Sequence, residues 1–234
     1  MKITREIDFQ HAGALSRALK AGKISRERFS LEICLRDAFQ AVCTAWKVEV
    51  ESRGARFIFS DDVRKQASAV AEWLVNPNGS PFLMLCGLCG NGKTSLALAL
   101  RRLIEYLTER ELGYRRGKYV RVATAKEIAD PMRSGAYGHQ RDSSSASRLP
   151  FANEEMLIVD DLGEEPRDVM VYGMVHTPLI DLISERYASR RFTIFTTNLD
   201  TDQIRQKYGE RIYDRLKECC TSIVFSNDSY RGRT

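Results

Sequence analysis

A glycine-rich segment between an apolar strand and a helix constrains this chain most. Residues 87–94 read Gly-Leu-Cys-Gly-Asn-Gly-Lys-Thr and match the pattern G-x-x-x-x-G-K-[ST]. The apolar run 82–86 precedes them, and a helical pattern at 96–100 follows. In that setting the backbone N–H groups of the loop surround a phosphate, and the helix N-terminus adds its dipole. The segment therefore predicts a strand, loop and helix that bind a nucleoside triphosphate.

The polar residues of this loop suit phosphates and their counter-ion. Lys93 is expected to neutralise phosphate charge, and the Thr94 hydroxyl is expected to bind Mg²⁺. A plain glycine-rich turn is the alternative, and it is disfavoured because both flanking segments have the predicted type. The expected nucleotide-binding residues are Gly87, Cys89, Gly90, Asn91, Gly92, Lys93, Thr94 and Ser95.

A second apolar segment ends in two carboxylates. Residues 156–161 read Met-Leu-Ile-Val-Asp-Asp, the form of a Walker B strand. Asp160 is expected to hold Mg²⁺ through water. Asp161 stands where many such ATPases carry a glutamate that polarises the attacking water, and its shorter side chain leaves the rate of hydrolysis open. The alternative for an acidic pair at a strand end is a helix N-cap or a solvated turn.

Size and composition limit the architecture and the partners. A chain of 234 residues, 43% hydrophobic, can bury one good-sized core and a small appendage. The net charge of +5 and the basic clusters at 101–102, 114–118 and 230–233 make nucleic acid a plausible partner, although solvated surfaces explain each cluster equally well. The cysteines show no disulfide framework and no apolar leader is visible, so we expect a cytoplasmic protein.

Strand and helix patterns alternate along the chain. Strands are expected at 82–86, 119–123, 156–161 and 192–196, with helices between them. This order predicts an α/β fold with a mainly parallel sheet and helices on both faces. Asn198 follows the last of these strands and is expected to point its amide toward the γ-phosphate and its attacking water. Its alternative role is to cap the helix at 200–208.

Residues 1–55 differ in character from the rest. Their amphipathic patterns predict a small helical module. Residues 46–51 alternate strictly and allow a hairpin with 56–59, but the same residues also allow the preceding helix to continue. The sequence leaves these two alternatives open.

Four further motifs accompany the glycine-rich loop: Asp-Asp-Leu-Gly at 160–163, Thr-Thr-Asn at 196–198, Gly-Glu-Arg-Ile-Tyr-Asp-Arg at 209–215 and Asp-Ser-Tyr-Arg at 228–231. With these motifs the chain resembles the DnaC/IstB branch of the AAA+ ATPases, which contains bacterial helicase loaders and ATPase subunits of some transposition systems. The resemblance covers about residues 60–234. It implies a P-loop AAA+ ATPase domain, here 56–234, without the typical helical lid.

The resemblance also assigns roles. Asn198 matches sensor 1, Arg215 matches the arginine finger that reaches a neighbouring subunit's nucleotide, and Arg231 matches the nucleotide-binding sensor 2 arginine. Residues 132–148 lie where these loaders carry an insertion that contacts single-stranded DNA, although a flexible solvated loop is an equal alternative. The expected DNA contacts are a stacking Tyr137 and the phosphate-following residues Arg133, Arg141 and Arg148.

The leading hypothesis is a Mg²⁺-dependent ATPase that self-assembles, binds single-stranded DNA and acts on a replicative helicase through residues 1–55. A transposition accessory ATPase, whose partner is a transposase, is the second hypothesis. A P-loop small-molecule kinase is the third, and the pair Asn198 and Arg215 disfavours it because these residues suit an ATP site shared between subunits. A nucleotide-dependent binding module with very slow hydrolysis is the fourth.

Overall fold

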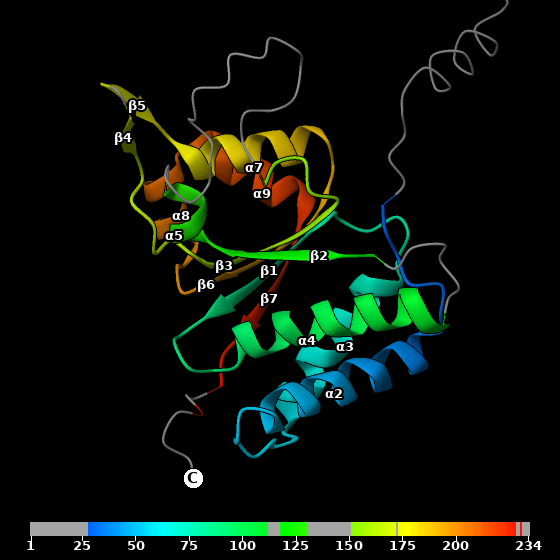
Figure 1. The fold of residues 1–234 in the computed structure, drawn as a ribbon. Coiled ribbons are helices and arrows are strands. Elements are labelled where there is room, and N and C mark those ends of the chain that lie inside the picture. The colour runs from blue at the N-terminus through cyan, green and yellow to red at the C-terminus, as the bar shows by residue number, and fades with distance from the viewer. Residues whose placement is uncertain (1–27, 112–117, 131–150, 172, 228–229, 231–234) are drawn as a thin grey trace, which may run out of the picture.

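The computed structural model describes residues 28–111, 118–130, 151–171, 173–227 and Tyr230, and it contains one five-stranded parallel sheet (Figure 1). The strands lie in the order β2-β3-β6-β1-β7, and all four neighbouring pairs are parallel. The expected α/β fold is therefore confirmed. The strands of this sheet are β1 (Phe82–Gly87), β2 (Val120–Thr124), β3 (Met156–Leu162), β6 (Phe192–Thr197) and β7 (Cys220–Phe225).

The sheet is buried on both faces, which explains its continuous apolar strands. In β1, Leu83 and Leu85 join one hydrophobic cluster while Phe82 and Met84 join the other. This alternation follows from the two-residue period of a strand. The same run of apolar residues therefore anchors the helices of both layers.

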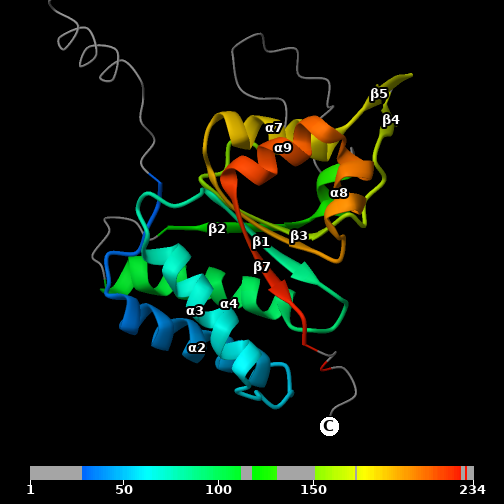
Figure 2. The ribbon, with the colours of Figure 1, turned by 180° about the vertical axis from the view of Figure 1, so that it is seen from behind.

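Helices cover both faces, as expected (Figures 1 and 2). One layer contains α2 (Leu35–Glu51), α3 (Asp61–Val75) and α4 (Lys93–Tyr106), which a π-helical turn (Leu107–Glu111) extends. The other contains α5 (Ala125–Ala129), α7 (Pro178–Ala188), α8 (Thr201–Tyr208) and α9 (Glu210–Cys219). Among the described residues, no helix is both long and apolar enough to cross a lipid bilayer.

Side-chain caps mark the starts of two helices. The Ser60 hydroxyl accepts a hydrogen bond from the Val63 N–H at 3.3 Å at the start of α3. Thr124 and Glu127 form a reciprocal capping box at the start of α5. These side chains satisfy backbone N–H groups that the first helical turn leaves without partners.

The segment 46–51 is helical, so the hairpin alternative is wrong. α2 runs to Glu51 and places Ala38, Val42 and Trp46 on one buried face. A strand would turn neighbouring residues to opposite faces, whereas the spacing of four brings these side chains together. The Trp46 ring lies 6.0 Å from that of Phe57 and 6.1 Å from that of Phe225, between ring centroids.

The described part of the N-terminal region packs into the core that lies against the sheet. Leu31 and the buried face of α2 belong to the same hydrophobic cluster as α3, α4 and one face of the sheet. The division at residue 55 remains a prediction about function, and residues 1–27 lie outside the described residues.

A short antiparallel hairpin follows β3, and the sequence pattern does not predict it. β4 (Val169–Val171) pairs with β5 (Met174–His176), and the hairpin projects beyond the sheet in both views (Figures 1 and 2). Met170, Met174 and Val175 are exposed on it. Its strands are too short to show a periodic pattern in the sequence.

Trp46→Ala is expected to lower the free energy of unfolding by about 3–5 kcal/mol, because it empties a large volume inside the shared core. Urea denaturation of the full chain measures this change. Val48→Ala is the control on the same helix, because Val48 is 52% exposed, and it should change stability by at most about 0.5 kcal/mol. Equally small changes for both variants would contradict the shared core.

Candidate nucleotide-binding site

A pocket of about 1240 Å³ opens where the carboxyl ends of the central strands meet the N-terminus of α4. Ligands of open α/β sheets bind at this edge, because loops from several strands converge there. The lining includes the polar residues Lys93, Asp160 and Asn198 and the aromatic residues Trp46 and Phe57. A nucleotide likewise combines charged phosphates with an aromatic base.

Glycine is required at the start of the loop. Gly87 has φ of 145°, and a Cβ there would lie 2.4 Å from the carbonyl oxygen of Phe225. The backbone of β7 therefore approaches too closely for any side chain. Residues 89–95 line the pocket, whereas Gly87 does not, so nucleotide binding by Gly87 stays a prediction.

The Lys93 ammonium joins the glycine-rich loop to the end of β6. Its Nζ donates to the carbonyl oxygens of Gly87 and Leu88, both at 2.7 Å, and to the side-chain oxygen of Asn198 at 2.9 Å. Burial lowers the pKa of Lys93, while nearby groups, including Asp161, favour the charged form. These hydrogen bonds hold the Lys93 ammonium group among the polar residues of the pocket.

Thr94 and Asp160 place a hydroxyl and a carboxylate side by side. The Thr94 hydroxyl donates to Asp160 Oδ1 at 2.9 Å, and the Thr196 hydroxyl donates to the same oxygen at 2.6 Å. Hydroxyl and carboxylate oxygens are the ligands that Mg²⁺ prefers, so this pair fits the cation. Both expected metal ligands therefore lie together in the pocket.

Asp161 adopts a left-handed backbone conformation with φ of 54°, which is uncommon for a residue with a side chain. Its N–H donates to the Thr196 hydroxyl at 2.9 Å, and its carbonyl accepts from the Glu164 N–H at 3.1 Å. Asp161 thus begins a turn, and it also lines the pocket. Burial, then Asp160 and Glu164, raise the pKa of its carboxyl group. A carboxylate with a raised pKa is a stronger base for a bound water.

Asn198 contacts Lys93 and does not cap the following helix. The N-cap of α8 is Asp200, whose carboxylate accepts from the Gln203 N–H at 2.9 Å. The capping alternative for Asn198 is therefore wrong. Asn198 lines the pocket at the end of β6.

The sequence analysis does not predict the aromatic and apolar residues that line the pocket. They are Trp46, Phe57, Ile58 and Tyr230. A Cβ on Gly92 would lie 3.5 Å from the Trp46 ring and 3.8 Å from the Tyr230 ring. These residues come from segments far apart in the sequence, and no local pattern marks them as binding residues.

The segment after β7 supports the loop through a chain of amides. The Asn91 side chain donates to the Phe225 carbonyl at 2.9 Å, and the Asn227 side chain donates to the Asn91 carbonyl at 3.2 Å. Gln66 on α3 donates in turn to Asn227 at 3.1 Å. The Tyr230 N–H also donates to the Gly90 carbonyl at 2.9 Å. The phosphate-binding loop is therefore held from outside the loop itself.

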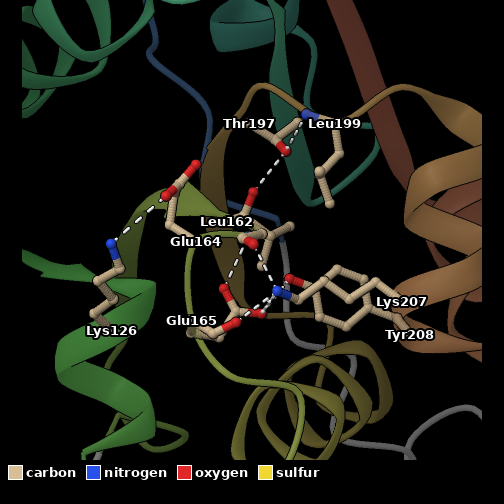
Figure 3. A network of polar contacts seen from close by, with 9 residues as sticks. Lys126, Leu162, Glu164, Glu165, Thr197, Leu199, Lys207 and Tyr208 are labelled. Carbon is tan, nitrogen blue, oxygen red and sulfur yellow. Dashed lines mark hydrogen bonds and ion pairs between the residues drawn. The ribbon is translucent and has the colours of Figure 1, made fainter.

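A buried polar network fixes the turn that carries Asp161 (Figure 3). The Glu165 carboxylate, fully buried, accepts from the Gly163 N–H at 2.8 Å and from the Tyr208 hydroxyl at 2.5 Å. The Lys207 ammonium lies 3.6 Å from the same carboxylate and donates to the carbonyls of Gly163 and Glu165. Burial and the Glu165 carboxylate raise the pKa of Tyr208, so its hydroxyl remains a donor.

Two further contacts extend this network to the neighbouring elements (Figure 3). The Thr197 hydroxyl donates to the Leu162 carbonyl at 2.6 Å, which joins the ends of β6 and β3. Lys126 on α5 forms an ion pair with Glu164 at 3.5 Å. The turn after β3 is consequently held by α5, β6 and α8, so the strained conformation at Asp161 has support on three sides.

Arg215 lies on α9 outside the pocket of its own chain. Its guanidinium carbon lies 5.2 Å from the centre of the Tyr187 ring. The Tyr187 hydroxyl donates to Glu218 at 2.5 Å, so within the described residues Glu218 is held by Tyr187 and not by an ion pair with Arg215. Arg215 is half-buried, and its role as an arginine finger stays a prediction.

Five predicted site residues cannot be placed, because they lie outside the described residues. They are the nucleotide-binding candidate Arg231 and the nucleic-acid candidates Arg133, Tyr137, Arg141 and Arg148.

Comparison with protein families gives one match over most of the chain. The model described as IstB-like ATP binding protein matches residues 47–234. Among curated proteins, the replicative helicase loader DnaC of Escherichia coli (strain K12) is 26% identical over 148 residues, which are 63% of this chain and 55% of that protein. The chain thus spans little more than half the length of this curated relative.

Solved structures share the fold. The crystal structure of the DnaC helicase loader aligns with a TM-score of 0.53 and 20% identity, over 78% of this chain and 99% of that one. The crystal structure of DnaI aligns with a TM-score of 0.50 and 21% identity, over 75% of this chain and 88% of that one. The central sheet and its helices therefore share the fold of these two structures.

Tyr208→Phe is expected to lower the free energy of unfolding by about 1–3 kcal/mol, because the buried Glu165 carboxylate loses a hydrogen-bond donor. Thermal or urea unfolding measures the change. Tyr119→Phe removes a hydroxyl from a residue that is 56% exposed, and it should shift stability by less than about 0.5 kcal/mol. Equal free energies of unfolding for the two variants would show that the Tyr208–Glu165 hydrogen bond does not contribute to stability.

Proposed function

This chain belongs to the family of IstB-like ATP-binding proteins, and from that premise we propose that it is a Mg²⁺-dependent ATPase that self-assembles, binds single-stranded DNA and acts on a replicative helicase. The observation that carries the ATPase proposal is the meeting of Lys93, Asn198 and the Thr94–Asp160 pair in one pocket. These are the groups that phosphoryl transfer to water needs: a cation, a metal site and an amide that orients the water.

The site residues divide the work of hydrolysis as follows. The loop N–H groups and Lys93 bind the phosphates, while Thr94 and Asp160 hold Mg²⁺. When bound, Mg²⁺ neutralises charge on the β- and γ-phosphates. Asp161 accepts a hydrogen bond from the attacking water and Asn198 orients it. The Asp161 side chain is one methylene shorter than glutamate, so slow basal turnover is expected.

A replicative helicase is the proposed partner. Support comes from the relatives, because the DnaC of Escherichia coli is named a replicative helicase loader. Residues 1–55 are the proposed contact, and residues 132–148 are the proposed contact with single-stranded DNA. The similarity to DnaC covers 55% of that protein.

A transposition accessory ATPase is the second candidate. The observation that favours it is the IstB-like family model, which matches residues 47–234. A small-molecule kinase has less support, because Arg215 lies outside the pocket of its own chain and suits a site shared between subunits.

The partner is tested by gel filtration of the full chain with the replicative helicase, and separately with a transposase, in the presence of ATP. We expect a complex with the helicase, and ATP hydrolysis that single-stranded DNA stimulates. A complex with the transposase alone would move the assignment to the second candidate. Phosphoryl transfer to a small acceptor, without stimulation by DNA, would contradict both.

Sharing of the ATP site between subunits is tested by mixing two inactive variants. Arg215→Ala chains keep the phosphate-binding loop, and Lys93→Ala chains keep the finger. Each variant alone should lose about 10³–10⁵ in turnover if the finger stabilises the charge of the transferred phosphoryl group. Mixed assemblies should recover part of the activity.

Steady-state ATP hydrolysis is measured at several mixing ratios of the two variants. Differently tagged chains establish that the variants assemble with each other. Lack of recovery in assemblies shown to be mixed would rule out action of Arg215 between subunits. A loss of only a few-fold in Arg215→Ala alone would assign Arg215 a structural role beside Tyr187, because an exposed contact of that kind contributes little.

A further inference from the structure

A cation that no motif predicts lies in the nucleotide pocket. Arg53, in the turn that follows α2, lines the pocket together with Ser95 of α4. Its Nη1 donates to the Ser95 hydroxyl at 3.5 Å. A guanidinium presents a rigid fork of donors that matches phosphate oxygens.

Arg53 is held in place by a buried carboxylate. Glu49 lies one helical turn earlier on α2 and is only 3% exposed. Its Oε1 accepts from Arg53 Nε at 3.0 Å and from Nη2 at 2.6 Å. These two bonds leave Nη1 to point along the pocket wall toward Ser95.

A second arginine balances the same carboxylate. Arg102 on α4 forms an ion pair with Glu49 Oε2 at 3.2 Å. Arg102 does not line the pocket. Glu49, Arg53 and Arg102 therefore carry one net positive charge, and the pocket side of this cluster is Arg53.

Arg53 lines the pocket beside the start of α4, where its Nη1 contacts Ser95. Lys93 and Thr94 are the residues expected to bind the outer phosphates and Mg²⁺, and Ser95 follows them at the start of a helix whose N–H groups suit phosphate. Trp46 and Phe57, which suit the base, line the same pocket. A nucleotide with its outer phosphates at Lys93 and Thr94 would therefore have its first phosphate, the one bonded to the ribose, within reach of Arg53.

We propose that Arg53 binds the α-phosphate of the nucleotide, and that Glu49 positions it for this contact. The inference rests on the proposed function only in requiring that the chain bind ATP. It adds a ligand-binding residue outside the glycine-rich loop and outside the carboxylate pair. It also connects the nucleotide directly to α2, whose other end leads into the N-terminal region.

The test compares Arg53→Ala with Arg102→Ala by isothermal titration of each full-length variant with ATP and with AMP. Each substitution removes one of the two arginines that neutralise Glu49: Arg53 gives two hydrogen bonds to Oε1, and Arg102 gives an ion pair to Oε2. Arg53→Ala should weaken both ATP and AMP about tenfold, the effect of one charge-assisted contact. Arg102→Ala should leave both affinities unchanged.

Several outcomes would overturn the inference. Unchanged affinity of Arg53→Ala for ATP and AMP would show that Arg53 does not contact the α-phosphate. Equal weakening in both variants would show that the effect is indirect and acts through Glu49. A loss for ATP without a loss for AMP would place Arg53 at the outer phosphates. Urea denaturation establishes that both variants fold, and Arg53→Lys should recover part of the affinity. Lack of ATP binding by the unmodified chain would contradict the proposed function instead.

Discussion

The hydrogen bonds of one ammonium group determine how this site is assembled. Lys93 lies at the first turn of α4, yet its donors reach the loop carbonyls of Gly87 and Leu88 and the amide of Asn198 beyond β6. A buried cation must find oxygen partners, so the loop curls around it and the ends of β1 and β6 stay in register. The carboxylate of Asp160 then reaches Thr94 because β3 pairs with β6 on the other side.

Sequence reasoning predicts the parts of this site that depend on local pattern. The glycine-rich loop and the strand that carries Asp160 and Asp161 each need residues within a few positions of one another. The parallel sheet follows from the alternation of strands and helices. Asn198 lines the pocket because strand ends in a parallel sheet share one edge, and its role toward the γ-phosphate stays a prediction.

The remaining parts depend on contacts between distant segments, which leave no periodic signal. Asn227 supports the loop from 136 residues away, and Glu165 meets Tyr208 across 43 residues. The helical state of residues 46–51 depends on the burial of Trp46 against Phe225. The alternation of apolar and polar residues in this segment therefore wrongly allows a strand. The sequence also does not show which charged residues are buried. Glu49 and Glu165 are buried, yet nothing in the sequence distinguishes them from surface residues.

α2 has mechanical significance because of its length and its two ends. A helix of 17 residues is about 25 Å long at about 1.5 Å per residue. One end reaches the pocket through Arg53, and the other begins at Leu35 beside the N-terminal region. Between these ends its buried face packs into the same core as α3 and α4. α2 therefore forms one continuous helical connection from the pocket to the residues that precede it in the chain.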